Sequence, residues 1–323
     1  MPEPPVGVLV MAYGTASGPD DVERYYTDIR GGRKPPPEHL RELRARYAAI
    51  GNVFPLLDIT RAQAEGLVSA LNSDGRTRFR AYLGMKHSPP FIAEAVTRMR
   101  EDAVERAVGI VMAPHWSAMS VETYFDRIRE SLDGAEHRPS FTYIPSWHQH
   151  PDFIEFVSGR VRSAVDRLPS AERDEAAVIF TAHSLPVRTV GDGSRRCLRC
   201  SCKDSCRYRD GLVETGELVA GTIGLPFWTV AWQSAGRTSD PWWGPPLEEV
   251  IEQVAAAGHS ACVVCAAGFV ADHLEILYDL DIEARRRAEK AGIRFERTEM
   301  PNADSGFCAA LANVVREHLH AET

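Results

Sequence analysis

Eight short apolar runs recur along the chain, and each is followed by polar or glycine residues and then by a stretch with helical spacing. Several runs are apolar almost throughout, as expected for parallel strands that helices cover on both faces. Strands that alternate with helices in this way predict an α/β fold with right-handed crossovers. The runs are residues 6–13, 78–83, 108–113, 140–144, 177–181, 228–232, 261–266 and 293–298.

The order of the runs predicts two similar halves, because four predicted strands precede residue 150 and four follow it. A length of 323 residues also favours two domains, since single cores stop growing near roughly 250–300 residues. We expect Rossmann-like domains at residues 1–146 and 147–306, each a parallel sheet flanked by helices, with the chain crossing at 147–151. Segment 307–323 should form a last helix that packs back on the body. The clearest other helical patterns are residues 92–106, 151–168 and 246–257.

Composition excludes several classes of protein. Hydrophobic residues make up 44% and charged residues 25% of the chain, as in an ordinary globular protein. A net charge of −8 gives no reason to bind nucleic acid or an anionic membrane. No segment approaches the ~20 apolar residues that span a bilayer, and residues 1–5 lack the positive charge of a secretory signal. We therefore expect a cytoplasmic protein whose seven cysteines stay reduced.

Histidines gather at the carboxyl ends of the predicted strands, where open parallel sheets bind their ligands. A lone histidine at such a place is more often structural, but six together favour function, because imidazole binds metals and transfers protons near neutral pH. Aromatic residues among them can sandwich a flat, conjugated ligand. The histidines are His87, His115, His148, His150, His183 and His273, and they are accompanied by Tyr13, Lys86, Trp232 and Glu275.

Residues 271–290 have the pattern of one continuous helix, in which Glu275, Asp279 and Glu283 lie four apart on one face. Like charges at this spacing destabilise a helix unless something compensates. One interpretation is compensation by solvent and by Arg286 and Arg287 a turn later. The other is a cation that rests on, or moves along, the carboxylate row.

Phosphate-binding motifs are absent from the sequence. GxxxxGK[ST] does not occur, and no GxGxxG follows the first predicted strand, where the chain reads MAYGTAS. A nucleotide-dependent enzyme is therefore not expected despite the Rossmann-like pattern.

Several segments together resemble the ferrochelatases, and most closely the soluble Gram-positive enzymes that act on coproporphyrin III. The resemblance covers nearly the whole chain in the same order. It implies a chelatase fold and the insertion of Fe²⁺, as substrate, into coproporphyrin III to give coproheme in haem biosynthesis. The segments are LVMAYGT (9–15), ERYYTDIRGGRKP (23–35), RARYAAIG (44–51), LGMKH (83–87), APHWS (113–117), TAHSLP (181–186), WQSAGRTSDPWWGP (232–245), GFVADHLEILYD (268–279) and EMPNA (299–303).

The resemblance also implies a role for individual residues. His183 matches the family's metal-binding and proton-accepting histidine, and Glu275 matches its partner carboxylate. Tyr13 matches the residue that faces the iron from the other side of the macrocycle, axial to the coproheme iron. A further group matches the surrounding shell and the acidic path behind Glu275: His273, Asp279, Lys86, His87 and Trp232.

Coproporphyrin carries four propionates, so its pocket needs cations and hydroxyl donors at the rim. Arg30, Arg46, Tyr47 and Tyr124 match the family positions that supply them, and an arginine fork pairs with a carboxylate through two parallel hydrogen bonds. Phe54 departs from the pattern, because relatives often carry serine there, and we leave it out of the predicted site.

A cysteine-rich insert at 195–207 is the second departure from cluster-free relatives. Cys197, Cys200, Cys202 and Cys206 follow the spacing CxxCxCxxxC in one loop. Zinc accepts four thiolates, and so does an iron–sulfur cluster. The insert looks similar to that of bacterial ferrochelatases with a [2Fe–2S] cluster, which is therefore the expected cofactor, with zinc as the alternative.

Two other functions stay open at this point. One is a chelatase that loads cobalt or nickel into a related tetrapyrrole, and the other is a non-catalytic haem or iron–sulfur carrier on the same fold. Arg30, Arg46 and MAYGT disfavour the first, and the presence of both His183 and Glu275 disfavours the second. The expected partners are coproporphyrin III and Fe²⁺, with transient contact to neighbouring enzymes of the haem pathway.

Overall fold

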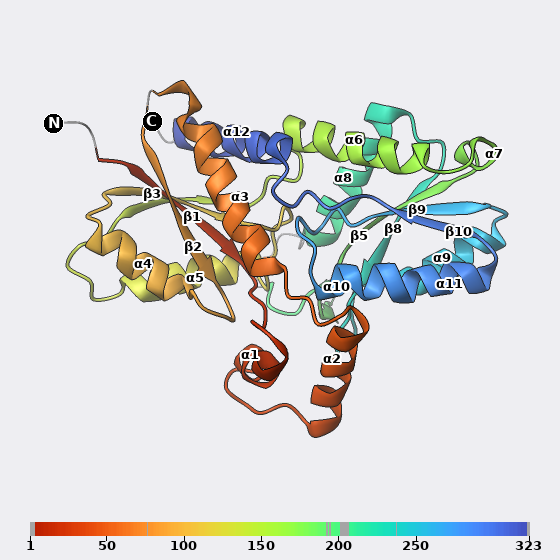
Figure 1. The fold of residues 1–323 in the computed structure, drawn as a ribbon, viewed down its shortest axis with the longest axis horizontal. Coiled ribbons are helices and arrows are strands. Elements are labelled where there is room, and N and C mark those ends of the chain that lie inside the picture. The colour runs from red at the N-terminus through yellow and green to blue at the C-terminus, as the bar shows by residue number, and fades with distance from the viewer. Residues whose placement is uncertain are drawn as a thin grey trace.

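Two four-stranded parallel sheets form the centre of the protein in a computed structural model, which describes residues 4–75, 77–191, 193, 195–200, 207–236 and 238–321 (Figure 1). The first sheet has the order β2-β1-β3-β4 and the second the order β10-β9-β5-β8. All eight predicted strands are confirmed, with ends shifted by up to two residues. Their bounds are β1 Val6–Ala12, β2 Phe79–Met85, β3 Arg106–Val111, β4 Ser140–Ile144, β5 Ala177–His183, β8 Trp228–Gln233, β9 Ala261–Cys265 and β10 Arg294–Arg297.

Helices cover both sheets, as the α/β pattern predicts. Strand β1 reads VGVLVMA and is buried at every position, which fits a central parallel strand with helices on both faces. The longer helices are α3 Leu56–Leu71, α4 Ile92–Glu101, α5 Val121–Leu132, α6 Pro151–Asp166, α8 Tyr208–Ile223, α9 Leu247–Ala256 and α12 Ser305–Ala321, and the short ones include α7 Ser170–Arg173, η1 Pro19–Asp21 and η2 Asn72–Asp74.

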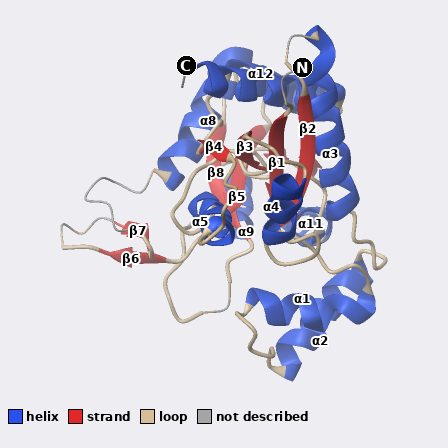
Figure 2. Ribbon diagram, turned by 90° about the vertical axis from the view of Figure 1, so that its left-hand side faces the viewer, coloured by secondary structure: helices blue, strands red, loops and turns tan. Residues whose placement is uncertain are grey.

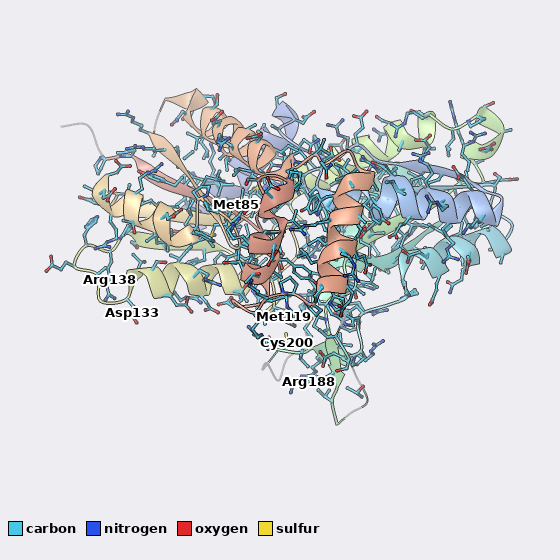
Figure 3. The ribbon with its side chains drawn as sticks, turned by 60° about the horizontal axis from the view of Figure 1, so that its bottom comes forward. Met85, Met119, Asp133, Arg138, Arg188 and Cys200 are labelled. Atoms are coloured by element: carbon cyan, nitrogen blue, oxygen red, sulfur yellow. The ribbon has the colours of Figure 1, made fainter. Side chains whose placement is uncertain are left out.

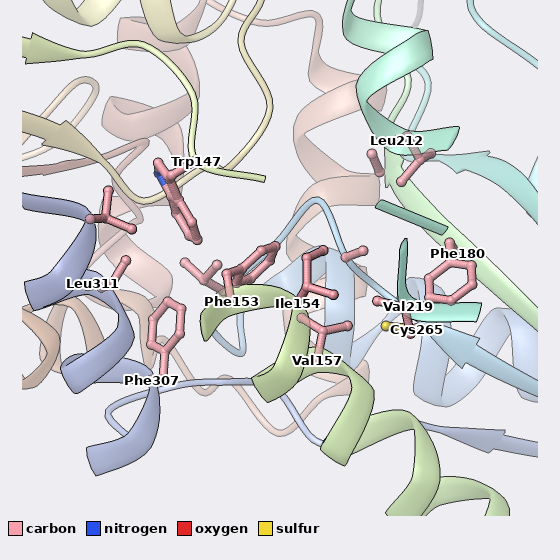
Figure 4. Packing of buried hydrophobic residues seen from close by; sticks show 14 of the residues in the cluster. Trp147, Phe153, Ile154, Val157, Phe180, Leu212, Val219, Cys265, Phe307 and Leu311 are labelled. Atoms are coloured by element: carbon pink, nitrogen blue, oxygen red, sulfur yellow. The ribbon is translucent and has the colours of Figure 1, made fainter. Parts of the chain in front are cut away.

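One hydrophobic cluster joins the two sheets (Figure 4). It contains Ile110 from the first sheet and Phe180 from the second, and between them Trp147 packs edge-on against Phe153 with ring centroids 4.9 Å apart. The last helix α12 packs on α3 and on α6, so it bridges the two halves. The predicted division into domains 1–146 and 147–306, with the segment 307–323 returning to the body, stays a prediction.

Two smaller units project from the sheets. Helices α1 Val22–Ile29 and α2 Pro37–Ala49 form a lobe below the sheets in Figure 1, and its own apolar cluster includes Tyr25, Tyr47 and Leu274. The antiparallel hairpin of β6 Val187–Thr189 and β7 Arg195–Cys197, which the strand pattern did not predict, projects from the body in Figure 2.

The predicted continuous helix at 271–290 is wrong. The segment forms a four-residue helix α10 Leu274–Leu277, a π-helix η3 Asp279–Ala284 and an α-helix α11 Arg285–Ala291. In η3 the amide of Glu283 donates to the carbonyl of Tyr278, five residues earlier, at 3.0 Å. The π-helix therefore changes how Glu275, Asp279 and Glu283 are arranged around the helix axis, although they remain four residues apart in the sequence. Within the described residues, no helix is long and apolar enough to cross a membrane.

Candidate active site

A cavity of about 610 Å³ lies between the carboxyl ends of the two sheets and the α1–α2 lobe. Cavities of this size hold flat cofactor-sized ligands. Tyr13 enters it from the first sheet, His183 from the second, and Arg46 from the lobe. Of the residues predicted from the sequence, the lining includes Tyr13, Arg46, Tyr47, Lys86, Tyr124, His183, His273 and Glu275.

Glu275 lies between two histidines at one end of this cavity. Its Oε1 atom is 3.6 Å from Nε2 of His183, the last residue of β5, and its Oε2 atom is 3.7 Å from Nε2 of His273. His273 immediately precedes α10, in which Glu275 is the second residue. Two chain segments that are 90 residues apart in sequence thus present three groups that hold protons or cations.

The electrostatics of the pair favour its charged form. Burial alone raises the pKa of Glu275, but the imidazoles of His183 and His273 outweigh it and hold that pKa below its usual range. Burial lowers the pKa of His183, and the Glu275 carboxylate outweighs this effect, so the pKa of His183 is raised. An imidazole of raised basicity beside a carboxylate is suited to take a proton from a bound substrate.

The backbone around Glu275 is fixed by a glutamine. The side-chain amide of Gln233, the last residue of β8, donates to the carbonyl of Glu275 at 3.0 Å and accepts from the Thr181 hydroxyl at 2.8 Å. Gly268 packs on β5 in the same region, where an added Cβ would lie 2.5 Å from Cβ of Ala182. The close approach of the two segments therefore requires glycine at this position.

Tyr13 supplies the face of the cavity that belongs to the first sheet. Its ring is open to the cavity and packs against the His87 ring with centroids 4.6 Å apart. Burial by the cavity walls, together with the Glu275 and Asp28 carboxylates, raises the pKa of Tyr13 well above its ordinary value, so the phenol is neutral near pH 7. The next residue, Gly14, has a φ of 102°, which side chains rarely adopt.

Lys86 follows β2 and lies beside Tyr13. Its Nζ atom donates to the Thr123 hydroxyl at 2.7 Å and lies 5.2 Å from the centre of the Tyr124 ring. Burial lowers the pKa of Lys86 to about 8. This ammonium is a cation at the cavity wall, on the side of the first sheet.

Arg46 pairs with Asp279. The sequence predicted a contact of Arg46 with a propionate at the rim and did not predict this ion pair. The guanidinium of Arg46 bonds the Asp279 carboxylate, and the Ser234 hydroxyl donates to the other carboxylate oxygen. Burial and the charges of Glu275 and Glu283 nevertheless raise the pKa of Asp279 to about 6. The pair connects the lobe to η3, and Arg46 also reaches the cavity.

The other predicted residues lie around the cavity in different ways. Tyr47 is buried and stacks on Phe54 with ring centroids 4.4 Å apart, which is consistent with the omission of Phe54 from the site. Arg30 follows α1 and is not part of the cavity lining, and its Nε atom is buried without a hydrogen-bond partner among the described residues. Trp232 is buried behind the site between Tyr208 and Trp243.

Glu275 of α10 and Asp279 and Glu283 of η3 differ in their surroundings, and the movement of a cation along them stays a prediction. Glu283 lines a second, shallow cavity with Arg286 and Arg287, while Arg287 itself bonds Glu252 at 2.7 Å. Of these three carboxylates, Glu275 lines the main cavity and Asp279 is paired with Arg46.

The six strand-end histidines separate into two groups. His183, His273 and His115 line the cavity, and His87 supports it. His148 bonds Glu214 at 2.9 Å, and His150 accepts a hydrogen bond at the start of α6, so both have structural partners.

Sequence reasoning missed several residues of the lining. Tyr25 donates to the carbonyl of Gly14 at 3.0 Å, and Tyr208 donates to the carbonyl of His183 at 2.9 Å. Neither residue follows a predicted strand, so a search of the carboxyl ends of the predicted strands could not find them. Tyr25 and Asp28 lie in the segment 23–35 that carries part of the family resemblance.

Two of the four cysteines of the insert are described. Cys197 ends β7 and Cys200 follows in a turn closed by a hydrogen bond from the Cys200 amide to the Cys197 carbonyl at 3.0 Å, and both side chains are buried. Arg188 of the hairpin donates to the carbonyl of Cys200 at 2.9 Å, and Figure 3 shows both residues in one part of the molecule. Cys202 and Cys206 lie outside the described residues. Within the described residues, no group of three or more histidine, cysteine or acidic side chains is arranged to hold a metal ion.

Comparisons of the sequence with known proteins agree on one family. A sequence model described as Ferrochelatase matches residues 5–319. The "Coproporphyrin III ferrochelatase" of Anoxybacillus flavithermus is 42% identical over 98% of this chain and 97% of its own, and that of Bacillus subtilis is 41% identical over 97% of this chain and 98% of its own. Among solved structures, SirB from Bacillus subtilis with Fe³⁺ has a similar fold, with a TM-score of 0.55 and 9% identity over 97% of this chain and 95% of that chain.

Proposed function

The chain belongs to the ferrochelatase family, and from that membership we propose that it inserts Fe²⁺ into coproporphyrin III to give coproheme. Enzyme class and fold follow from the same relatives, whereas the roles of individual residues are part of the proposal. The observation that carries it is the placement of His183 and Glu275, 3.6 Å apart, in a cavity of about 610 Å³ that Tyr13 enters from the other sheet.

Insertion requires Fe²⁺ to replace two pyrrole protons, so the cavity must accept protons as well as a cation. In the proposed reaction the neutral imidazole of His183 takes the first proton, because its pKa is raised and it faces the cavity, and the second proton is released to solvent. Glu275 stabilises the imidazolium that results and attracts the incoming cation. His273, which contacts the other carboxylate oxygen, keeps Glu275 ionised. Tyr13 faces the metal from the other side of the macrocycle.

The sparse ligand set suits a metal in transit. Storage sites for divalent cations surround the ion with four or more ligands, while the described residues contain no preformed group of three. A substrate metal must leave its protein ligands for the macrocycle, and a histidine with one carboxylate holds it weakly enough for that transfer.

The cations near the cavity support a substrate with several carboxylates. Arg46 and Lys86 line it, and Tyr47 and Tyr124 add phenol groups. Arg30 does not line the cavity, so its contact with a propionate requires the α1 end to move or the substrate to extend beyond the cavity. Coproporphyrin III has four propionates and protoporphyrin IX has two, so the cations Arg46 and Lys86 favour the former.

For the insert we propose a [2Fe–2S] cluster held by Cys197, Cys200, Cys202 and Cys206, with zinc as the alternative. Cys197 and Cys200 form a CxxC turn with buried side chains, a spacing common among metal-binding thiolates. Arg188, which contacts the turn, brings a positive charge that offsets thiolates. When bound, a cluster would tie this loop together and leave the chemistry of insertion to the cavity.

One assay tests the proposed function. Fe²⁺ insertion is measured anaerobically with coproporphyrin III and, in parallel, with protoporphyrin IX, and each is repeated with Co²⁺ and Ni²⁺. We expect insertion of Fe²⁺ into coproporphyrin III to have the highest kcat/KM. Faster turnover of protoporphyrin IX would contradict the proposed substrate, a preference for Co²⁺ or Ni²⁺ would indicate another chelatase, and tight binding without turnover would indicate a carrier. We place this activity in the cytoplasm, with transient contacts to neighbouring haem-pathway enzymes.

A further inference from the structure

Asp28 makes a short contact across two units of the fold. Its Oδ1 atom, near the end of α1 in the lobe, lies 2.7 Å from Nδ1 of His87, which follows β2 of the first sheet. The His87 side chain is buried, and the Asp28 side chain is 36% exposed. Residues 59 positions apart are thus joined by a hydrogen bond to a charged acceptor, a type stronger than its neutral counterpart.

The contact determines which nitrogen of His87 carries the proton. A carboxylate can only accept, so Nδ1 must donate, and a neutral imidazole then has its lone pair on Nε2.

The fixed ring of His87 in turn supports Tyr13. The two rings are 4.6 Å apart at an angle of 58°. Arg30 follows Asp28 by only two positions at the end of the same helix. The end of α1 therefore holds both a guanidinium expected to meet a propionate and the carboxylate that orients His87 behind Tyr13.

We propose that Asp28 is a positioning residue for metal insertion: its carboxylate holds His87 in the Nδ1–H form and thereby fixes His87 against Tyr13. A carboxylate that orients a histidine is a common outer-shell device at metal sites, and its loss typically costs about 10–100-fold in affinity or activity. Here the histidine acts on Tyr13, the residue proposed above to face the iron, so the effect on insertion rests on the proposed function.

The chain offers well-matched variants for a test. Asp28→Asn keeps the size of the side chain, and because that side chain is partly exposed, the substitution leaves the core unchanged. Asp28→Glu restores the carboxylate. Glu23→Gln is the control, since Glu23 lies on the same helix, is 41% exposed and pairs with Lys34 and Arg44 instead of His87.

Two measurements are made on each variant. The ¹⁵N chemical shifts of the His87 ring report its tautomer in the protein without substrate, and steady-state assays with Fe²⁺ and coproporphyrin III separate kcat from KM. We expect the Nδ1–H form in the wild type and its loss in Asp28→Asn, with kcat about 10-fold lower and KM for the porphyrin nearly unchanged. Asp28→Glu should recover most of both signals, and Glu23→Gln should match the wild type.

The proposal is overturned by a wild-type His87 that carries its proton on Nε2. It is equally overturned if Asp28→Asn keeps the tautomer, or loses the tautomer without a change in kcat. A wild type that shows the Nδ1–H form but inserts no metal contradicts the proposed function instead. In that case the tautomer comparison between wild type and Asp28→Asn still decides whether Asp28 positions His87.

Discussion

His183 and Glu275 face one another at 3.6 Å although β5 and α10 supply them separately. Glu275 raises the pKa of His183 and His183 lowers the pKa of Glu275, so each favours the charged form of the other. Both side chains are about one-third exposed. The His183–Glu275 pair therefore lies at the cavity wall and is accessible to a cation that enters the cavity.

The first prediction concerns His183. His183→Ala should reduce Fe²⁺ insertion by about 10²–10⁴-fold, because the proton acceptor is lost while few core contacts are. Loss of porphyrin fluorescence under anaerobic conditions measures insertion, and thermal melting checks the fold. His259→Ala is the control, since that half-buried histidine bonds the backbone carbonyl of Glu175 at 2.7 Å and is not part of the cavity lining. Wild-type turnover in His183→Ala would contradict the assignment.

Glu275→Gln should also be severely impaired. The amide keeps the shape of the side chain but removes the charge that opposes the effect of burial on His183. The pKa of His183 should therefore fall, and a ¹⁵N titration of its ring should show the neutral form down to a lower pH than in the wild type. Near-normal metal insertion in this variant would transfer the role to His273 or Asp279.

Arg46→Ala should raise the KM for coproporphyrin more than it lowers kcat. A contact with a propionate stabilises the bound substrate and the transition state alike, so its loss appears mainly in binding. Arg44→Ala is the matched control, because Arg44 lies on the same helix and pairs with Glu23 at 3.8 Å. An unchanged KM in Arg46→Ala would show that Arg46 pairs with Asp279 and does not contact the porphyrin.

The raised pKa of Asp279 predicts how stability depends on pH. The folded protein binds this proton more tightly than the unfolded chain, so ionisation of Asp279 costs stability as pH rises from about 4 to about 6. A displacement from 3.8 to about 6 corresponds to ~3 kcal/mol. The free energy of unfolding of Asp279→Asn and of the wild type should be measured by urea unfolding at pH 4 and pH 7. Relative to the wild type, the variant should be more stable at pH 7 than at pH 4 by about that amount. A difference in the free energy of unfolding between the two proteins that does not change with pH would contradict the raised pKa of Asp279.

The insert should bind metal independently of the cavity. Anaerobically purified protein is expected to be reddish-brown, with iron and acid-labile sulfide near two each per chain if the cluster is full. Cys200→Ser should lose the colour and melt at a lower temperature before the chemistry changes, whereas Cys308→Ala, on α12, should keep the colour. Colourless protein with one zinc per chain would refute the cluster. A stable Cys200→Ser that binds porphyrin but inserts no iron would show that the cluster serves catalysis.

The fold was predictable from the sequence because its signal is local. Strands such as β1 and β9 are buried at every position, so each appears as a continuous apolar run. The hairpin of β6 and β7 has three-residue strands with exposed positions and left no such signal. The helix at 271–290 was wrong because a helical pattern does not distinguish an α-helix from a π-helix whose hydrogen bonds depend on tertiary contacts.

The site was predictable only in part, for a related reason. His183, His273 and Tyr13 lie where the strand-end rule directs attention. The partner of Arg46 comes from 233 residues further along the chain, and the contact of Asp28 with His87 spans the lobe and the first sheet. Such pairings depend on how separate units pack, which no spacing in the sequence encodes.

The π-helix η3 makes the site sensitive to chain length in a way that substitutions do not reveal. Loss of a single residue between 279 and 284 would let the segment return to regular α-helical bonding, which turns everything before it by about 100° relative to α11. Asp279 would then rotate away from Arg46 although neither residue had changed. Single-residue deletions in η3 should therefore be more harmful than any surface replacement there, and an alignment gap at this position in a relative marks a different arrangement of the lobe.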